Sequence, residues 1–354
     1  MNITELERKF AEKIGTKHCI AMNSGTSALH AALYAMGVDI GDEVISPALT
    51  VVMNTFATMY LGAIPIYVDV DPDTFLIDPK EIEKAITPDT KAIQVVGLFG
   101  LPCNIEPIME ISKKYGIPVL EDNAQCFLGR HKNGTISGSQ STMAMFSTES
   151  SKHISCGEGG FLVTNDTDLA LKARKFAGLG YQTLRVDEGR PKLSKELFHM
   201  PDFKRHDTIG FNYRMPQLCV EALGPQVENL EEVVNLRIHN AKAFDDVLSK
   251  YDFFKAQKSD GYVNSYWTYA TLYSGSIPWL ELYKRFRANG GEGFHGSLSL
   301  PYKELFMQGS PFADVSCPVA EFLQPNLMLF HTNFKTQEAL DEQIVALKKT
   351  LDTI

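Results

Sequence analysis

The sequence predicts an α/β protein with a mostly parallel central sheet flanked by helices, followed by a smaller α+β C-terminal domain. Continuously apolar runs of strand length alternate with helix-like periods through the first half of the chain. Strands that are apolar on both faces need helices on both sides of their sheet, which is typical of parallel or mixed sheets. The composition is that of an ordinary globular chain, with 354 residues of which 44% are hydrophobic and 22% charged.

The first half of the chain supplies the predicted central sheet. A helix is expected to begin at residues 23–27 and to end at about Met36, because Gly37 and Gly41 then break it. An amphipathic helix is expected before it, at 4–14, and later helices between the strands 44–46 and 63–68 and at 105–115. The expected strands are 19–22, 44–46, 63–68, 92–96, 118–120, 143–147 and 161–164.

The second half predicts a connection and a smaller domain. Residues 178–214 are polar and irregular, and such a long connection favours a functional role. We expect a large domain over 1–214, a connecting long helix over 215–251, either single or a broken pair, and a small domain over 252–354. Within the small domain, strands are expected near 265–273 and 327–331, and helices near 277–289, 313–323 and 336–352.

Charge and cysteine content exclude several classes of protein. With 34 Lys and Arg against 43 Asp and Glu, the net charge of -9 argues against a general nucleic-acid binder. The six cysteines are scattered without metal-ligand spacing, so we predict reduced thiols and no metal site. The charge-free stretch 44–68 contains Pro47, Asn54, Gly62 and Pro65, which would break or wet a membrane helix. Without a signal-peptide pattern, we expect a cytoplasmic protein that does not bind membranes.

Three segments carry residues suited to a ligand site: backbone N–H groups that can bind an anion, a carboxylate, and a lysine whose amine can react. The small residues from Asn23 to Leu29 lie between a strand and a helix, where free backbone N–H groups bind phosphate. Asp122 follows a predicted strand, at the sheet edge where ligands of open α/β sheets gather. Lys152 lies among small residues, where desolvation or a neighbouring cation would lower its pKa and make its amine a nucleophile.

Each segment alone also has a simpler explanation. Ser24 or Thr26 could be a plain helix cap, an acid can end a strand, and a lysine can lie on the surface. Glu158 lies between glycines and is typical of a turn residue, and His131 and His153 are isolated histidines.

Together the three segments match one cofactor, pyridoxal phosphate (PLP), which needs a phosphate site, an acid at its ring nitrogen and a lysine for an imine. The chain also resembles the DegT/DnrJ/EryC1/StrS family of PLP-dependent sugar aminotransferases, over about residues 5–240. The resemblance implies the PLP-dependent transferase fold of type I, as in aspartate aminotransferase. The matching runs are NSGTSALHAAL, VDVDPDTFLIDP, EDNAQCFLG, FSTESSKHISCGEGGFLVTND and GFNYRMPQLCVEALGPQVENL, with a weaker continuation through CPVAEFL and the final helix.

The resemblance implies a role for each matching residue. Lys152 and Asp122 would be catalytic: Lys152 would form the internal aldimine and move the proton between carbon centres, and Asp122 would pair with the pyridinium nitrogen. Gln125 would hydrogen-bond the ring hydroxyl. The remaining cofactor contacts would be Gly25, Thr26, Ser27 and Ser147 at the phosphate, Val51 at the ring, and Asn212 at the phosphate of the other subunit.

The sequence departs from the family pattern at three points. Family members usually have a further segment before the first helix, which shapes the mouth of the active site. Val51 replaces an aromatic residue that would stack on the ring, and Thr148 and Glu149 replace an aromatic residue or histidine. These departures concern the substrate more than the cofactor.

The resemblance implies transfer of an amino group from L-glutamate to a nucleotide-linked keto sugar, in amino sugar biosynthesis, by a homodimer with shared active sites. The alternatives are a PLP-dependent sugar dehydratase, a cyclic-polyol aminotransferase and a non-catalytic regulatory protein of the same fold. The dehydratase branch replaces the lysine with histidine, so Lys152 favours an aminotransferase. Lys152 and Asp122 together favour an enzyme over a regulatory protein.

Overall fold

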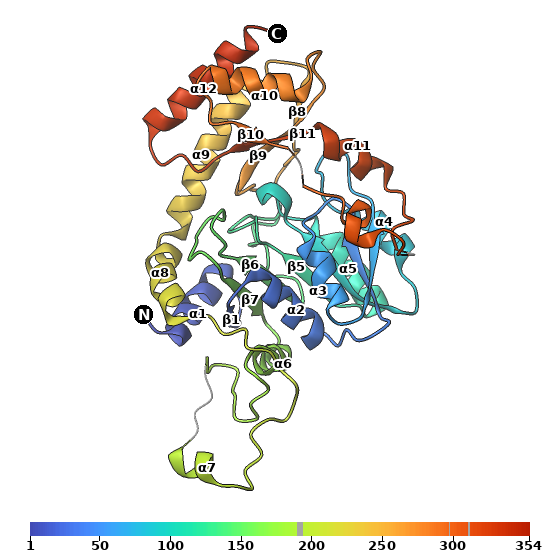
Figure 1. The fold of residues 1–354 in the computed structure, drawn as a ribbon, viewed down its shortest axis with the longest axis vertical. Coiled ribbons are helices and arrows are strands. Elements are labelled where there is room, and N and C mark those ends of the chain that lie inside the picture. Colours follow the sequence, from blue (N-terminus) through green and yellow to red (C-terminus); the bar gives the residue numbers. More distant parts are fainter. Residues whose placement is uncertain (190–193, 297, 311) are drawn as a thin grey trace.

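The computed structural model describes residues 1–189, 194–296, 298–310 and 312–354. Two sheets organise the chain, a seven-stranded one in the larger part and a four-stranded one in the smaller part (Figure 1). The long helix α9 (Leu230–Leu248) runs from the larger part into the smaller one. This arrangement confirms the predicted fold class.

The central sheet is mostly parallel. Its strand order is β1-β7-β6-β5-β4-β2-β3, and β7 alone runs in the direction opposite to the other six strands. The strands are β1 (His18–Met22), β2 (Glu43–Pro47), β3 (Ile64–Val68), β4 (Thr90–Val96), β5 (Val119–Asp122), β6 (Met143–Ser147) and β7 (Gly160–Thr164).

Both faces of this sheet are covered, as its apolar strands require. In β1, Cys19 and Ala21 face a core that includes α1 and α8, whereas Ile20 and Met22 face a core that includes α2 and α6. The helices of this part are α1 (Ile3–Ile14), α2 (Gly25–Ala35), α3 (Met53–Met59), α4 (Pro79–Ala85), α5 (Ile105–Tyr115) and α6 (Thr167–Ala177), with the 3-10 turn η1 (Leu98–Gly100).

The small sheet is antiparallel, in the order β10-β11-β9-β8, and lies between two cores. Met328 and Phe330 of β11 pack with residues of α9, α10 and α12, whereas Leu327 and Leu329 pack with residues of α5 and the central sheet. The remaining elements are β8 (Phe254–Ala256), β9 (Thr268–Tyr273), β10 (Phe294–His295), β11 (Leu327–His331), α10 (Trp279–Ala288), α11 (Pro318–Asn326), α12 (Gln337–Leu351), η2 (Pro301–Lys303) and η3 (Leu305–Met307).

The two connecting regions predicted from the sequence have different forms in the structure. The segment after residue 216 is a pair of helices, α8 (Gln217–Glu228) and α9, which meet at Asn229. Residues 178–189 and 194–214 leave the body as a long excursion with the short helix α7 (Lys195–His199) at its far end, at the bottom of Figure 1.

The predicted helix at 313–323 lies instead at 318–326, in α11. Pro318 occupies its first turn, where a missing N–H costs nothing. The Asp69 carboxylate accepts hydrogen bonds from the next two N–H groups, of Val319 and Ala320, both at 2.8 Å. A residue distant in the sequence therefore sets where this helix begins.

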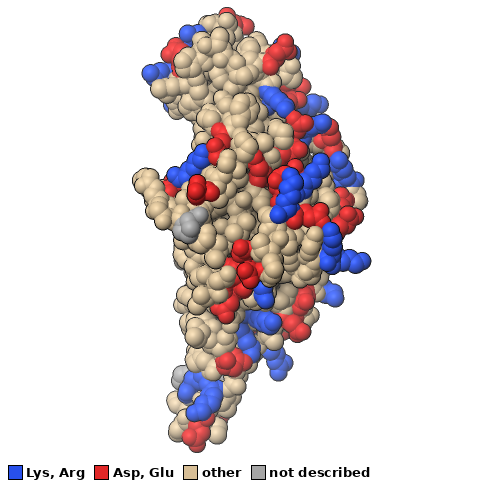
Figure 2. Space-filling model, turned by 90° about the vertical axis from the view of Figure 1, so that its right-hand side faces the viewer, with Lys and Arg blue, Asp and Glu red and all other residues tan. Residues whose placement is uncertain are grey.

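The surface carries both signs of charge. On the face in Figure 2, Lys and Arg side chains alternate with Asp and Glu and form no extended patch of one sign. Within the described ranges, no helix combines the length and the apolar character needed to cross a bilayer.

Candidate active site

A cavity of about 350 Å³ lies where α2 begins and where β5 and β6 end. It brings together the three segments that the sequence analysis selected. Of the nine predicted site residues, Ser27 and Asn212 do not line it. Those that do are Gly25, Thr26, Val51, Asp122, Gln125, Ser147 and Lys152, joined by Ser24, Leu29, Met53, Val96, Ala124, Met145, Glu149 and Glu158.

The start of α2 leaves two backbone donors free at this cavity. Ser24 is the N-cap, and its side chain accepts the Ser27 N–H at 3.0 Å. The Ser27 hydroxyl donates to Asn23 Oδ1 at 2.7 Å, so both polar groups of Ser27 are engaged within the cap. The N–H groups of Gly25 and Thr26 have no acceptor among the described residues. These two groups, at the positive end of the helix, suit a phosphate.

Two glycines allow the strands to approach this helix start. A Cβ atom on Gly25 would lie 2.9 Å from Met145 Cε and 3.0 Å from Ser147 Cβ. A Cβ atom on Gly160 would lie 2.7 Å from the Ser24 carbonyl oxygen. The glycine-rich turn before β7 thus ends in a residue that has to lack a side chain, because β7 runs against the beginning of α2.

Asp122 presents a buried carboxylate without a cationic partner. It ends β5 and is 1% exposed. Its oxygens accept the Ala124 N–H at 3.0 Å and the Asn54 side-chain amide at 2.9 Å, and no ion pair to it occurs among the described residues. Burial raises the pKa of Asp122, although both hydrogen bonds and the Lys152 amine favour its charged form. Such a carboxylate suits a cation, for example a protonated ring nitrogen.

Asn54 is a site residue that the sequence analysis missed. It lies fully buried in α3 and holds Asp122 through Nδ2, which also donates to Thr50 Oγ1 at 3.2 Å. Its Oδ1 atom has no partner in the structure. A single amide within the apolar stretch 44–68 was a usable signal, but the sequence analysis applied it only against a membrane helix.

Gln125 is oriented by an unusual backbone conformation. Phe99 has φ +64°, in the left-handed region, and its N–H donates to Gln125 Oε1 at 2.8 Å. The amide NH₂ group of Gln125 therefore remains available, since it makes no hydrogen bond among the described residues. This donor suits the predicted contact with the ring hydroxyl of the cofactor.

Lys152 lies in a compact loop between β6 and β7. The Thr148 N–H donates to the Gly159 carbonyl at 2.9 Å, which closes the two ends of this loop. The Lys152 ammonium lies 4.6 Å from the ring centroid of Trp267, a residue of the smaller part. Burial lowers the pKa of Lys152, the Asp122 and Glu149 carboxylates oppose this change, and the Arg237 guanidinium adds to it.

The neighbouring histidines and thiols have other surroundings. His153 is buried, its Nε2 lies 3.0 Å from the Ser265 carbonyl oxygen, and burial lowers the pKa of His153 to about 3. His131 is buried, and neither of its ring nitrogens has a partner in the structure. All six cysteines are unpaired: Cys19, Cys103, Cys126 and Cys317 are buried, and Cys156 and Cys219 are half-buried.

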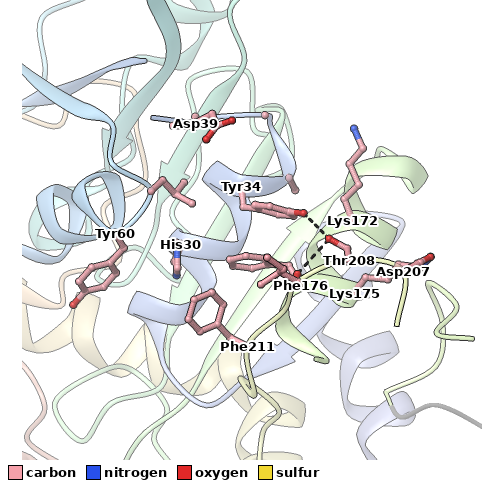
Figure 3. Close-up of a pocket in the computed structure, with 15 residues that line it drawn as sticks. His30, Tyr34, Asp39, Tyr60, Lys172, Lys175, Phe176, Asp207, Thr208 and Phe211 are labelled. Carbon is pink, nitrogen blue, oxygen red and sulfur yellow. Dashed lines mark hydrogen bonds and ion pairs between the residues drawn. The ribbon is translucent and has the colours of Figure 1, made fainter. Parts of the chain in front are cut away.

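A larger hollow of about 610 Å³ lies beside α2, which contributes His30 and Tyr34 to its lining (Figure 3). Aromatic side chains such as Tyr34, Tyr60, Phe176 and Phe211 line it, with His30 among them. Burial lowers the pKa of His30 to about 4, so this imidazole is neutral at pH 7. The one lysine and carboxylate that pair with each other in the described lining of this hollow, Lys175 and Asp207, are partly exposed, so we place the active site in the smaller cavity.

The residues present fit PLP. The cavity combines two free N–H groups and the Ser147 hydroxyl for a phosphate, an unpaired buried carboxylate for a cationic ring, and a buried lysine amine. Asn212 lies on the surface, outside this cavity, so the structure of one chain leaves its predicted contact untested.

Comparisons with known proteins agree with this chemistry. A GDP-perosamine synthase from Caulobacter vibrioides is 41% identical over 230 residues, which are 65% of this chain and 57% of the relative. A UDP-2-acetamido-2-deoxy-3-oxo-D-glucuronate aminotransferase from Pseudomonas aeruginosa is 40% identical over 244 residues, which are 69% and 62% of the two chains. Both matches therefore span less than two thirds of these relatives.

The fold has similar solved structures. The X-ray structure of the aminotransferase from Psychrobacter cryohalolentis has a TM-score of 0.89 at 25% identity and covers 99% of this chain and 91% of its own. The model of one protein family matches residues 1–290. The chain belongs to the DegT/DnrJ/EryC1/StrS aminotransferase family.

Proposed function

We propose that this protein is a PLP-dependent aminotransferase that moves an amino group from L-glutamate to a nucleotide-linked keto sugar. One observation carries the proposal: the Lys152 amine and the unpaired Asp122 carboxylate line the same cavity as the free N–H groups of α2. The amino-acid donor and the sugar acceptor come from the family resemblance. The name of the Pseudomonas relative specifies a 3-oxo sugar linked to UDP, which supports this class of acceptor.

Different residues of the cavity would bind the cofactor and transfer the proton. When bound, PLP supplies an aldehyde that condenses with amines and a protonated ring that takes up electrons. Gly25, Thr26 and Ser147 would hold its phosphate, and Asp122 would keep the ring nitrogen protonated. Lys152 Nζ would remove the proton from the α-carbon of the amino donor, a task that its lowered pKa assists at neutral pH.

The donor and the acceptor can be tested separately. With PLP bound, L-glutamate alone should bleach the visible absorbance of the protein and release one equivalent of 2-oxoglutarate. Addition of the correct keto sugar nucleotide should restore the absorbance and yield an amino sugar nucleotide, identified by mass spectrometry from a panel of candidates. If glutamate and glutamine both fail while another amine succeeds, the proposed donor is wrong.

The same panel separates the alternatives. A sugar dehydratase would release a deoxygenated sugar and would return the amino group rather than keep it in the product. A cyclic-polyol aminotransferase would accept a keto-inositol and no sugar nucleotide. A regulatory protein would bind PLP without any turnover. Lys152 favours the aminotransferase over the dehydratase branch, in which histidine occupies this position.

We also propose a cytoplasmic homodimer whose two active sites are shared. Several apolar side chains near the larger hollow are exposed in the single chain: Ile209 is 84% exposed, Tyr60 60% and Phe211 43%. A second copy of the chain would cover them, since monomeric proteins rarely expose such clusters. Asn212 lies beside Phe211, outside the cavity of its own chain, where it could serve the partner's phosphate site.

The proposed division of the chain into domains remains 1–214 for the PLP-binding domain, 215–251 for the connection and 252–354 for the small domain.

Mixed dimers test the shared site. Lys152→Ala and Asn212→Ala homodimers should each be impaired. A mixed dimer collects both lesions in one site and leaves the other site intact, so mixing should restore up to half of the wild-type activity per heterodimer. If differently tagged chains co-purify and no activity returns beyond that of the two parents, Asn212 serves its own chain and the shared site is wrong.

A further inference from the structure

Three consecutive residues around the proposed catalytic lysine are held by the connecting helix α9 and by the smaller part of the molecule. The Trp267 indole N–H donates to the Ser151 carbonyl at 2.8 Å. The Arg237 guanidinium donates to the Lys152 carbonyl at 3.2 Å. His153 Nε2 lies 3.0 Å from the Ser265 carbonyl oxygen. We call these contacts of residues 151–153 with Arg237 and residues 265–267 the lysine clamp.

The segment 265–267 is itself rigidly placed. The Ser265 N–H donates to the Gly100 carbonyl at 2.8 Å, and Tyr266 has φ +46°, in the left-handed region. The Thr332 hydroxyl, just after β11, lies 2.6 Å from the Tyr266 carbonyl oxygen and 3.1 Å from that of Trp267. The clamp therefore fixes Lys152 relative to both sheets.

Arg237 is the member of the clamp that carries a buried positive charge without a carboxylate partner among the described residues. It is 5% exposed, and its fork donates to the Trp267 carbonyl at 2.9 Å, the Thr332 hydroxyl at 3.2 Å and the Lys152 carbonyl. Across the described ranges, it forms no ion pair with a carboxylate. Burial lowers the pKa of Arg237 to about 10, so the side chain is still charged at neutral pH. Buried arginines are normally neutralised by a carboxylate, and this one is not.

We propose that Arg237 is a positioning residue for Lys152, whose fork fixes the Lys152 backbone and whose uncompensated charge disfavours a second positive charge on the Lys152 amine. The proposal deepens the proposed function, because it rests on Lys152 as the reacting amine. It assigns to a helix of the connecting region a part in preparing that amine.

The other groups facing Lys152 act in the opposite direction. The carboxylates of Asp122 and Glu149 favour its protonated form, and so does the π-face of Trp267. Burial and Arg237 favour the neutral amine. Without the guanidinium, no nearby positive charge would counter the effect of the two carboxylates and the indole ring on the Lys152 amine. The pKa of Lys152 would therefore rise.

The test uses the full chain without cofactor, so that its outcome does not depend on PLP chemistry. Reductive methylation reacts with neutral amines, and peptide mass spectrometry gives its rate at Lys152 as a function of pH. The variants are Arg237→Met, which removes the fork and the charge, Arg237→Gln, which keeps an amide donor, and Arg237→Lys, which keeps the charge. Arg285→Met, at a half-buried residue of α10 that pairs with Glu281, is the control for a change of one unit in net charge.

The neutral variants should label Lys152 about threefold or more slowly at pH 8, because a smaller fraction of the amine would be neutral without the nearby guanidinium charge. Arg237→Lys should stay within about twofold of wild type, and Arg285→Met should match it. If Arg237→Met does not fold, Arg237→Gln gives the same comparison. Unchanged labelling in a folded neutral variant would overturn the proposal, and so would equal slowing in Arg237→Lys and Arg237→Gln. Covalent trapping of PLP at Lys152 is measured separately, so failure here leaves the proposed function standing.

Discussion

The Asp122→Asn substitution separates charge from shape at the base of the cavity. The carboxylate accepts one N–H from Ala124 and one from Asn54. An amide at position 122 keeps the first contact, and its new NH₂ group can face the Asn54 amide if that amide flips. Asn54 Oδ1, which has no partner, would then accept from it. The fold should therefore tolerate the change, and only the negative charge is lost.

The expected loss follows from the burial of this charge. A hydrogen bond to a charged group contributes about 1.5–3 kcal/mol, against about 0.5–1.5 kcal/mol for a neutral one. The difference corresponds to about tenfold, and Coulomb attraction across a cavity with 1% exposure of Asp122 adds to it. We expect at least about a hundredfold loss in the rate of the glutamate half-reaction, equivalent to about 2.7 kcal/mol of barrier.

The same substitution should change stability in the opposite direction. Burial raises the pKa of Asp122 in the folded chain, so ionising it costs the cofactor-free fold free energy above that pKa. This cost disappears as the pH falls below the ordinary pKa of the unfolded chain. Without cofactor, Asp122→Asn should therefore raise Tm at pH 7, and the difference should vanish in acid.

Single-turnover absorbance with glutamate measures the rate, and thermal denaturation of the cofactor-free chain measures Tm. Cofactor loading is checked by absorbance before each rate measurement. A fully loaded variant with a nearly normal rate would refute the role of Asp122 as the partner of the ring nitrogen. A lower Tm for the cofactor-free variant at pH 7 would refute the claim that this carboxylate lacks a sufficient partner in the cofactor-free protein.

Two further substitutions test the framework of the cavity. Glu7 and Arg174 form an ion pair with both side chains 5% exposed, so Glu7→Gln should cost about 3–5 kcal/mol of unfolding free energy in urea, because a buried charge is left unpaired. Glu12→Gln, which breaks the exposed pair with Arg8, should cost less than about 1 kcal/mol, and similar losses in the two variants would contradict the account. Gly160→Ala should weaken PLP binding and destabilise the fold by about 1–3 kcal/mol, because the new Cβ meets the Ser24 carbonyl oxygen at 2.7 Å. In Gly224→Ala, within α8, the new Cβ meets only the Met1 side chain, at 3.3 Å or more, so PLP affinity should be unchanged; equal PLP affinities in the two variants would show that the glycine at 160 is not required.

Much of the fold could be predicted because burial on both faces leaves a trace in the sequence. The apolar runs at 143–147 and 161–164 coincide with β6 and β7, whose alternate residues face two different cores. The order of the strands left no such trace, so nothing in β7 indicates that it runs antiparallel between β1 and β6. The edge strands β8 and β10 have three and two residues, too few for a periodic pattern, and form because β9 and β11 offer partners.

The site, like the fold, contains some residues that have a signal in the sequence and others that do not. Residue type and position in the chain made Asp122 and Lys152 candidates, because an acid at a strand end and a lysine before a glycine turn are local features, and the family resemblance implied their roles. Arg237 and Trp267 act through contacts with residues far away in the sequence, so only the folded chain identifies them. Asn54 left a signal, as the one amide of an apolar stretch, but its partner Asp122 is seen only in the folded chain. Ser27 resembles a phosphate ligand in the sequence, yet the structure shows its N–H and hydroxyl engaged in the helix cap.

The central claim is that Lys152 carries the cofactor, and peptide mapping after borohydride reduction tests it most directly. Purified protein loaded with PLP should be yellow, and reduction should leave a phosphopyridoxyl group on one peptide, the one that contains Lys152. Lys152→Ala should bind PLP without any covalent label. Labelling of a different lysine in the wild-type protein, or undiminished labelling of Lys152→Ala, would contradict the account.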